Sequence, residues 1–85
     1  MKLGKLVLAA MLVIGATAPA VADREPSVEE RAGIEAALRA HGFATWEDIE
    51  LDDGWWRVDD AVTVDGREYD LTLDPWTLAI VEGRR

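Results

Sequence analysis

The chain has 85 residues, contains no cysteine and carries a formal net charge of −8 at pH 7. Without cysteine it can form neither a disulfide framework nor a thiol-based site. The acidic balance argues against nucleic acid as a partner, because binding phosphates requires basic side chains.

The N-terminal segment up to Ala22 has the layout of a secretory signal peptide. Basic Lys2 and Lys5 precede an apolar stretch over residues 6–14, and small residues follow up to Ala22. This order is typical of an export signal with a small-x-small cleavage site. The apolar run is short for a membrane span, and charged residues begin directly after Ala22, which favours cleavage over a retained anchor. We therefore expect a periplasmic or secreted protein with no stable membrane anchoring after cleavage.

Cleavage after Ala22 would leave positions 23–85 as a single small domain. Domains of this size fold alone but are only marginally stable. This part has seven arginines against 17 acidic residues, a net charge of −10. Such a charge suits basic partners or cations, although solubility alone would also account for it.

A helix is predicted from about Val28 to Ala40. Ser27 and, three residues later, Glu30 match a capping box at its start. Gly42 fits the left-handed position that follows a helix end, and Phe43 fits the hydrophobic contact that accompanies it. The inner stripe of the helix is expected to consist of Ile34, Ala37, Leu38 and His41.

Two Asp-Gly pairs, Asp53-Gly54 and Asp65-Gly66, are each typical of a two-residue β-hairpin turn. The first turn predicts the cross-strand pairs Ile49–Val58, Glu50–Arg57 and Leu51–Trp56. The second predicts the pairs Val64–Arg67, Val62–Tyr69, Val58–Leu73 and Arg57–Asp74. Together they place Arg57 on one face, and on the other a core made of Ile49, Leu51, Trp56, Val58, Val62, Tyr69 and Leu73.

This register would also place Asp60 on the core face, opposite Leu71. A buried carboxylate without a partner is costly, so we expect a β-bulge near Asp59-Asp60 to turn it outward.

The last turn is predicted at Asp74 to Thr77, with Pro75 in its second position. Leu78 to Val81 would form the last strand, and residues 82–85 would fray. The predicted fold is α+β: one N-terminal helix packed on a four-stranded antiparallel meander.

This order of elements resembles that of the small stand-alone PepSY-domain proteins of bacterial periplasms. The resemblance spans the whole mature chain and rests on cap and turn residues. These are Gly42-Phe43, Asp53-Gly54, Asp65-Gly66, and Asp74-Pro75 with Thr77. The family often has glycine after that threonine, where this chain has Leu78, so the turn into the last strand is expected to differ. PepSY domains occur in the propeptides of thermolysin-like proteases, so the resemblance implies an inhibitory or chaperone role and no catalytic residue.

The residues themselves predict neither an enzyme nor a cofactor. After Ala22 the only serine, Ser27, and the only histidine, His41, lie at opposite ends of the predicted helix. Fourteen residues at ~1.5 Å each separate them by roughly 20 Å, too far for a Ser-His pair. One histidine cannot supply a zinc site. A small hydrolase with paired carboxylates ranks last among the functions considered.

The clustered acidic residues suggest an alternative function, that of an envelope protein that binds calcium and responds to this cation. Asp48, Glu50 and Asp52 resemble the start of an EF-hand loop, but glycine stands at 54 rather than 53. Solvated charges that protect strand edges are the preferred interpretation. The ligands in this alternative would be Asp52, Asp53, Asp59 and Asp60.

The tryptophans suggest a binding surface. Trp56 is predicted to enter the core, whereas Trp55 should lie on the opposite face beside Arg57. Trp46 is two residues before Asp48 on the same predicted strand, so both side chains are expected to point outward. Trp76 is predicted to lie in a turn. Tryptophan and arginine are enriched as anchors in interfaces, although a tiny domain also exposes such residues simply because it cannot bury them all. The expected function is that of a non-enzymatic exported module that binds a protein or peptide. The resemblance suggests a protease as this partner. The expected binding residues are Trp55, Arg57, Trp76 and Trp46.

Overall fold

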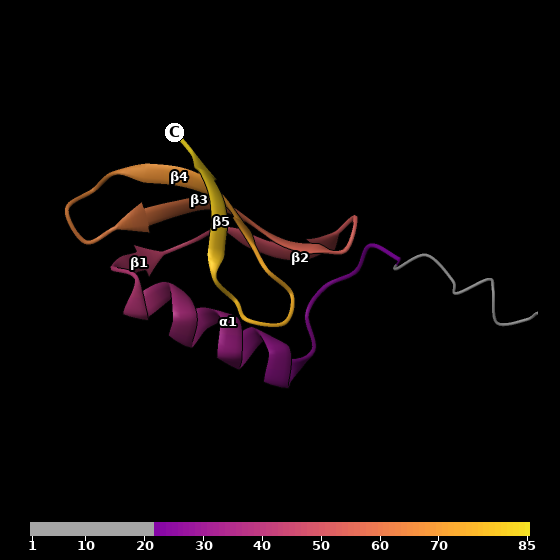
Figure 1. Ribbon diagram of the computed structural model, residues 1–85. Coiled ribbons are helices and arrows are strands. Elements are labelled where there is room, and N and C mark those ends of the chain that lie inside the picture. Colours follow the sequence, from indigo (N-terminus) through magenta and orange to yellow (C-terminus); the bar gives the residue numbers. More distant parts are fainter. Residues whose placement is uncertain (1–21) are drawn as a thin grey trace, which may run out of the picture.

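The computed structural model describes residues 22–85. The predicted signal peptide lies, except for Ala22, outside the described residues, so its cleavage stays a prediction. Helix α1 (Val28–Ala40) is followed by the strands β1 (Phe43–Thr45), β2 (Asp48–Asp52), β3 (Trp55–Thr63), β4 (Glu68–Leu73) and β5 (Ile80–Arg84). The helix covers one face of the antiparallel sheet, which confirms the predicted α+β fold (Figure 1). Within residues 22–85 no helix is long and apolar enough to cross a membrane.

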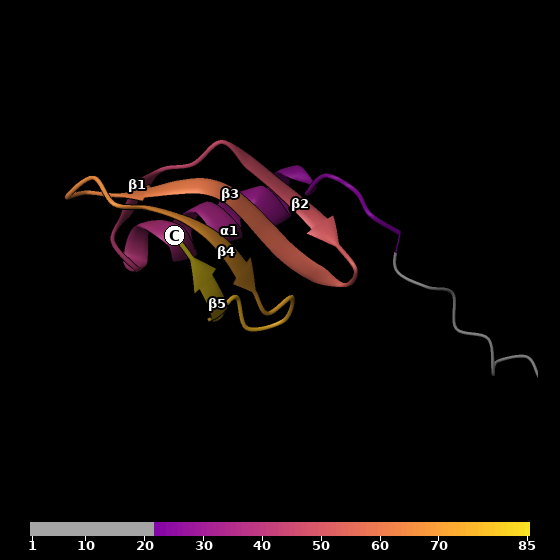
Figure 2. The same cartoon turned by 90° about the horizontal axis from the view of Figure 1, so that it is seen from above.

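The sheet differs from the predicted meander in its first strand. Both β1 and β2 pair with β3, which pairs in turn with β4, and β4 with β5. The chain leaves the ladder after Thr45 and returns at Asp48, so one predicted strand is divided into two short ones. Seen from above, the strands lie side by side with α1 behind them (Figure 2).

Helix α1 has the predicted bounds and the predicted caps. Ser27 Oγ accepts a hydrogen bond from Glu30 N at 3.1 Å, and Glu30 Oε1 accepts one from Ser27 N at 2.9 Å. Gly42 follows the helix with φ +89°, which glycine adopts without strain. The predicted place of His41 in the inner stripe was wrong, because its side chain is exposed. Its ring Nδ1 donates a hydrogen bond to the Ala37 carbonyl at 2.8 Å, at the C-terminal end of the helix.

The first hairpin has the predicted register. Ile49 pairs with Val58, Glu50 with Arg57, and Leu51 with Trp56. Both turn residues, Asp53 and Gly54, have positive φ angles of 57° and 84°. Two positive values are what the type I′ turn of an Asp-Gly hairpin requires.

The predicted register of the second hairpin was wrong by one residue. Thr63 N donates to Arg67 O at 2.8 Å, so the loop has three residues rather than two. Gly66, with φ +91°, takes the left-handed position that closes such a loop. Ala61 therefore lies opposite Tyr69 and is buried, and Val62, predicted to be in the core, is only half-buried.

The β-bulge expected at Asp59-Asp60 is present. Asp60 has φ +52°, and the register shifts between Val58 and Ala61. The shift places Val58 opposite Leu71, so the predicted pairs Val58–Leu73 and Arg57–Asp74 were wrong. Asp60 is consequently not a buried polar residue, and its backbone N–H donates to Asp70 Oδ1 at 3.1 Å.

The last strand begins later and extends further than predicted. Asp74 Oδ1 accepts hydrogen bonds from the N–H groups of Trp76 and Thr77 at 2.8 and 2.9 Å, and these bonds lower the pKa of its carboxyl. The turn is wider than predicted, because Asp74 N donates to Ala79 O at 2.9 Å and Leu78 adopts φ +62°. Strand β5 therefore runs to Arg84, and the expected fraying of residues 82–85 was wrong for all but Arg85.

The hydrophobic core lies between α1 and one face of the sheet. Tyr69, Trp46, Leu78 and Ile80 pack around it, partly exposed. Its buried members are Ile34, Leu38, Phe43, Ile49, Leu51, Trp56, Val58, Ala61, Leu71 and Leu73.

Candidate functional site

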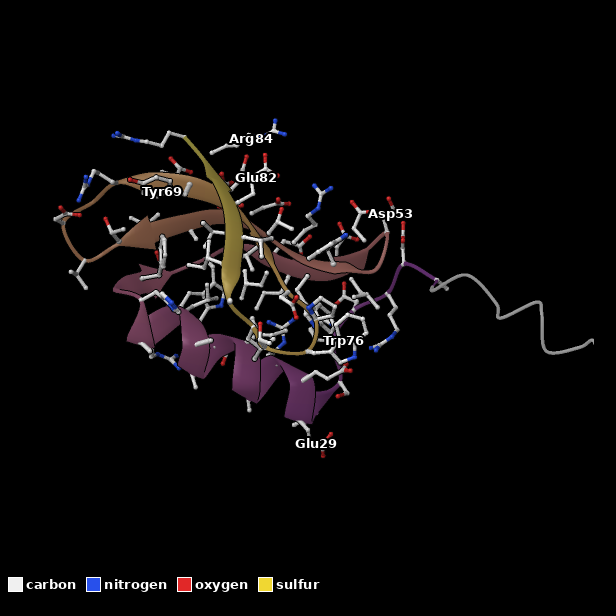
Figure 3. The ribbon with its side chains drawn as sticks, viewed as in Figure 1. Glu29, Asp53, Tyr69, Trp76, Glu82 and Arg84 are labelled. Atoms are coloured by element: carbon white, nitrogen blue, oxygen red, sulfur yellow. The ribbon has the colours of Figure 1, made fainter. Side chains whose placement is uncertain are left out.

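The sheet has one face that α1 does not cover, which we call the open face. On β3 its members alternate with buried Trp56 and Val58. In Figure 3 the side chains of Glu82 and Arg84 lie on the side of the sheet opposite α1. The open face consists of Asp48, Glu50, Trp55, Arg57, Asp59, Asp70, Thr72, Glu82 and Arg84.

Trp55 and Arg57 lie on the open face as predicted. Trp55 is 40% exposed whereas its neighbour Trp56 is 4% exposed, so Trp55 is the tryptophan that the core excludes. Arg57 is two residues along the same strand, ~6–7 Å away, so the two side chains are neighbours on one surface. Opposite Arg57 lie Glu50 on β2 and Thr72 on β4.

A hollow of about 160 Å³ lies on the open face beside Arg57. Its walls carry two arginines, Arg57 and Arg84, and the carboxylates of Asp59, Asp70 and Glu82, with Thr72 between them. Arg84 Nε is bound to Glu82 Oε2 at 2.9 Å, whereas none of the ion pairs within residues 22–85 involves Arg57. The hollow thus offers a partner both a guanidinium and several carboxylates.

Several carboxylates of the open face are held close together. Asp48 and Asp59 lie directly opposite each other across β2 and β3. Partial burial, and then the charges of Asp70 and Asp48, raise the pKa of Asp59. Local desolvation, followed by the charges of Asp48 and Asp52, likewise raises the pKa of the exposed Glu50. A positively charged group from a partner would relieve this repulsion.

Trp46 does not belong to this surface, and its predicted outward position was wrong. The break between β1 and β2 ends the strict alternation at this point, and the ring packs against the core. The Arg39 guanidinium lies 5.2 Å from the ring centroid and covers it from the helix side. Trp46 therefore has a structural role.

Trp76 lies away from the open face. It is 87% exposed on the turn between β4 and β5, near the N-terminal end of α1 (Figure 3). The four predicted binding residues thus divide into one pair on the open face, one packed ring and one separate exposed ring.

The four predicted calcium ligands are not brought together. Asp52 and Asp53 lie at the tip of the first hairpin, where the backbone N–H of Asp53 donates to Asp23 Oδ1 at 3.1 Å. Asp59 is four positions along β3 from Trp55, the partner of Asp52. Four positions along an extended strand span roughly 13 Å, too far for one ion to bridge. In the part of the chain that the structure describes, no three histidine or acidic side chains are grouped so that they could hold a metal ion.

Sequence reasoning missed the part of the site that β4 and β5 supply. Because the predicted register was incorrect, Thr72 was not placed opposite Arg57, where the structure has it. Glu82 and Arg84 were assigned to a frayed chain end instead of a strand. The alternation of charged Glu82 and Arg84 with Val81 and Gly83 was the available indication of a longer strand.

Comparison with known proteins gives one match. A family model described as "Peptidase propeptide and YPEB domain" (PepSY) matches residues 5–84, nearly the whole chain. No curated protein and no solved structure matches the chain.

Proposed function

Since the chain belongs to the peptidase propeptide and YPEB domain family, we propose that it is an exported binding module that holds a protein or peptide partner on the open face of its sheet. Domains of this family are associated with peptidase propeptides and are typically non-catalytic. A peptidase is therefore the first class of partner to test, and another envelope protein is the second.

The observation that carries this proposal is the pair Trp55 and Arg57. Both side chains are exposed on a face that no described segment covers, and Arg57 has no ion pair within residues 22–85. Tryptophan and arginine contribute most to binding when a partner desolvates them, because each combines a large contact area with a hydrogen-bond donor. The adjoining hollow adds a concave surface to this anchor pair.

Charge defines the kind of partner further. Residues 23–85 carry a net charge of −10, and the carboxylates of the open face repel one another. A partner with basic groups would be attracted over a distance and would relieve this repulsion on contact. The layout of residues 1–22 supports export, so we place the encounter in the periplasm or outside the cell.

Affinity capture followed by a binding titration tests the proposal. Protein exported by its own N-terminal segment is purified, used to capture partners from an envelope extract, and titrated against each purified candidate. Trp55→Ala and Arg57→Ala are compared with Val64→Ala, which removes an exposed apolar side chain from the tip of the second hairpin.

We expect each open-face variant to weaken binding by about tenfold or more, as for truncated interface anchors. The Val64 variant should bind like the natural protein, and all three should keep its melting temperature. Equal binding by all variants would contradict the proposed surface. An effect of the bound module on peptidase turnover would decide between modulation of a peptidase and simple binding.

A further inference from the structure

Strand β5 forms one edge of the sheet, and within residues 22–85 it pairs with β4 alone (Figure 2). The opposite edge is partly covered, because Arg24 N donates to Leu51 O at 3.1 Å and Leu51 N donates to Arg24 O at 2.7 Å. The outer side of an edge strand presents a row of backbone donors and acceptors that another strand can pair with. The edge of β5 is therefore the one that is available to a further strand.

The regular part of this edge is the segment Glu82–Arg84. The pairing of β5 with β4 is irregular at Val81 and regular from Glu82 onward. The side chains of Glu82 and Arg84 lie on the open face (Figure 3). Gly83 alternates with them and faces the α1 side, where an added Cβ would lie 3.2 Å from Leu71 Cδ2. The segment thus offers one acidic and one basic side chain on the same face, with no side chain between them.

This order of charges is complementary to itself. When two copies of one strand pair antiparallel about a two-fold axis, one residue lies on the axis and positions equally far from it face each other. With Gly83 on the axis, Glu82 of each copy faces Arg84 of the other. With Glu82 or Arg84 on the axis, two like charges would face each other directly, which destabilises strand pairing. One register of the regular segment therefore matches opposite charges twice.

We propose that the edge of β5 binds β5 of a second copy of this chain, antiparallel, with the two-fold axis at Gly83. Each Arg84 guanidinium, already bound to Glu82 of its own chain at 2.9 Å, would gain the facing carboxylate of the second copy, so that four charges alternate in sign. The residues after Val81 include two arginines and one acid, so the two copies meet where repulsion is weaker than the net charge of −10 over residues 23–85 implies.

The dimer would also enlarge the open face. Glu82 and Arg84 form one wall of the hollow beside Arg57, so the same pair from the second copy would adjoin that wall. The two hollows would then lie side by side across the axis, on one continuous sheet. Since the regular segment is short, the interface is small, and association should be reversible and concentration-dependent. The dimer itself does not rest on the proposed function.

Sedimentation velocity of the protein exported by its own N-terminal segment, with no other protein present, tests the proposal. Over concentrations from about 10 μM to about 1 mM the natural protein should pass from monomer towards dimer. Glu82→Arg and Arg84→Glu each bring like charges face to face, so each should weaken dimerisation about tenfold or more. An equimolar mixture of the two variants should associate again, because one then has two basic residues on the segment and the other two acidic residues.

Two further variants serve as controls. The double variant Glu82→Arg/Arg84→Glu keeps the net charge and the self-complementarity, so it should dimerise like the natural protein. Glu47→Arg makes the same charge change as Glu82→Arg at an exposed position between β1 and β2, and it should dimerise normally. Melting temperatures check that every variant is folded. The proposal is overturned if the natural protein stays monomeric, if the single variants dimerise as it does, or if the mixture or the double variant fails to associate.

Discussion

Trp55 and Trp56 are adjacent in the sequence but lie on opposite faces of β3, because successive strand side chains alternate. Trp56 is enclosed by the core and its ring is covered on one side by Arg24, whereas Trp55 faces solvent beside Arg57. The same residue type therefore stabilises the fold at one position and is available for binding at the next.

The two positions predict opposite effects of truncation. Trp56→Ala should lower the free energy of unfolding by ~3–5 kcal/mol, enough to unfold much of a domain of this size. Trp55→Ala should change it by roughly 0.5 kcal/mol or less, as for a surface residue. Urea unfolding of both variants measures this difference. A larger loss for Trp55→Ala than for Trp56→Ala would mean that the faces of β3 are reversed.

Arg24 and Glu30 connect the N-terminal segment to the helix. The hydrogen bonds from Arg24, together with those from Ser27, lower the pKa of Glu30 from 4.5 to about 2. Arg24 also exchanges backbone hydrogen bonds with Leu51 at 3.1 and 2.7 Å, so the segment is held against the edge of β2. The ionised form of Glu30 thus stabilises the folded chain.

This lowered pKa predicts a defined acid sensitivity. A carboxyl with a depressed folded-state pKa contributes stability above its unfolded value, and the contribution is lost as the pH falls from about 4.5 towards about 2. Glu30→Gln should therefore melt below the natural protein at neutral pH, and the two melting temperatures should converge over that window. Glu29→Gln is the control, since Glu29 has no ion pair within residues 22–85. A constant difference between Glu30→Gln and the natural protein from pH 7 to pH 2 would refute the role assigned to Glu30.

At the scale of elements, α1 and the first hairpin were predictable because local sequence determines them. The Ser27–Glu30 capping box and Gly42 set the ends of the helix, and Asp53-Gly54 fits a turn with two positive φ angles. The second Asp-Gly pair forms a three-residue loop instead. The bulge places Asp59 and Asp60 of β3 opposite a single residue of β4, which shifts the pairing by one residue. The three-residue loop shifts the pairing of the two strands by one residue more.

The same reasoning explains which parts of the candidate site were predictable. Trp55 and Arg57 follow from the first hairpin alone, so their place on the open face was correct. Thr72, Glu82 and Arg84 depend on the bulge, on the loop and on the left-handed Leu78. Leucine does not indicate a positive φ angle, so no residue type in the sequence marked that turn. Trp46 was misplaced because a break between two strands leaves no periodic pattern to extrapolate.

The packing of α1 on the sheet gives a prediction at this scale. Leu38 is fully buried between the helix and the strands, so Leu38→Ala should cost ~2–5 kcal/mol of unfolding free energy. Ala36→Ser, on the exposed side of the same helix, should cost roughly 0.5 kcal/mol. Chemical denaturation of the two variants compares them. Similar stabilities would mean that α1 does not pack on the sheet through Leu38.

For the whole molecule, the excess of negative charge both favours basic partners and opposes the folded state. Desolvation, and after it the charges of neighbouring carboxylates, raise the pKa values of Asp59 and Glu50, so part of this repulsion acts on the open face. A surface that is electrostatically unfavourable when free is suited to binding, because a cationic partner removes the penalty.

Removing one of these charges should stabilise the free protein. The pKa of Asp59 is raised above its ordinary value of 3.8, so its ionisation destabilises the folded chain once the pH rises above that value. Asp59→Asn should therefore raise the melting temperature at pH 7, and the gain should vanish below about pH 3.8. Asp53→Asn removes the same charge from the hairpin tip and should have a smaller effect. No gain at pH 7 for Asp59→Asn would show that the repulsion on the open face is negligible.

The most direct test of the proposed function is a map of the bound surface. Backbone and indole signals of the ¹⁵N-labelled protein can be followed while a purified partner from the capture experiment is added. The proposed open-face interface predicts that the largest changes occur at Trp55, Arg57, Thr72 and Arg84, with the exposed side of α1 around Ala36 unaffected. Changes centred on Ala36 and the outer side of the helix, with those four residues unperturbed, would contradict it.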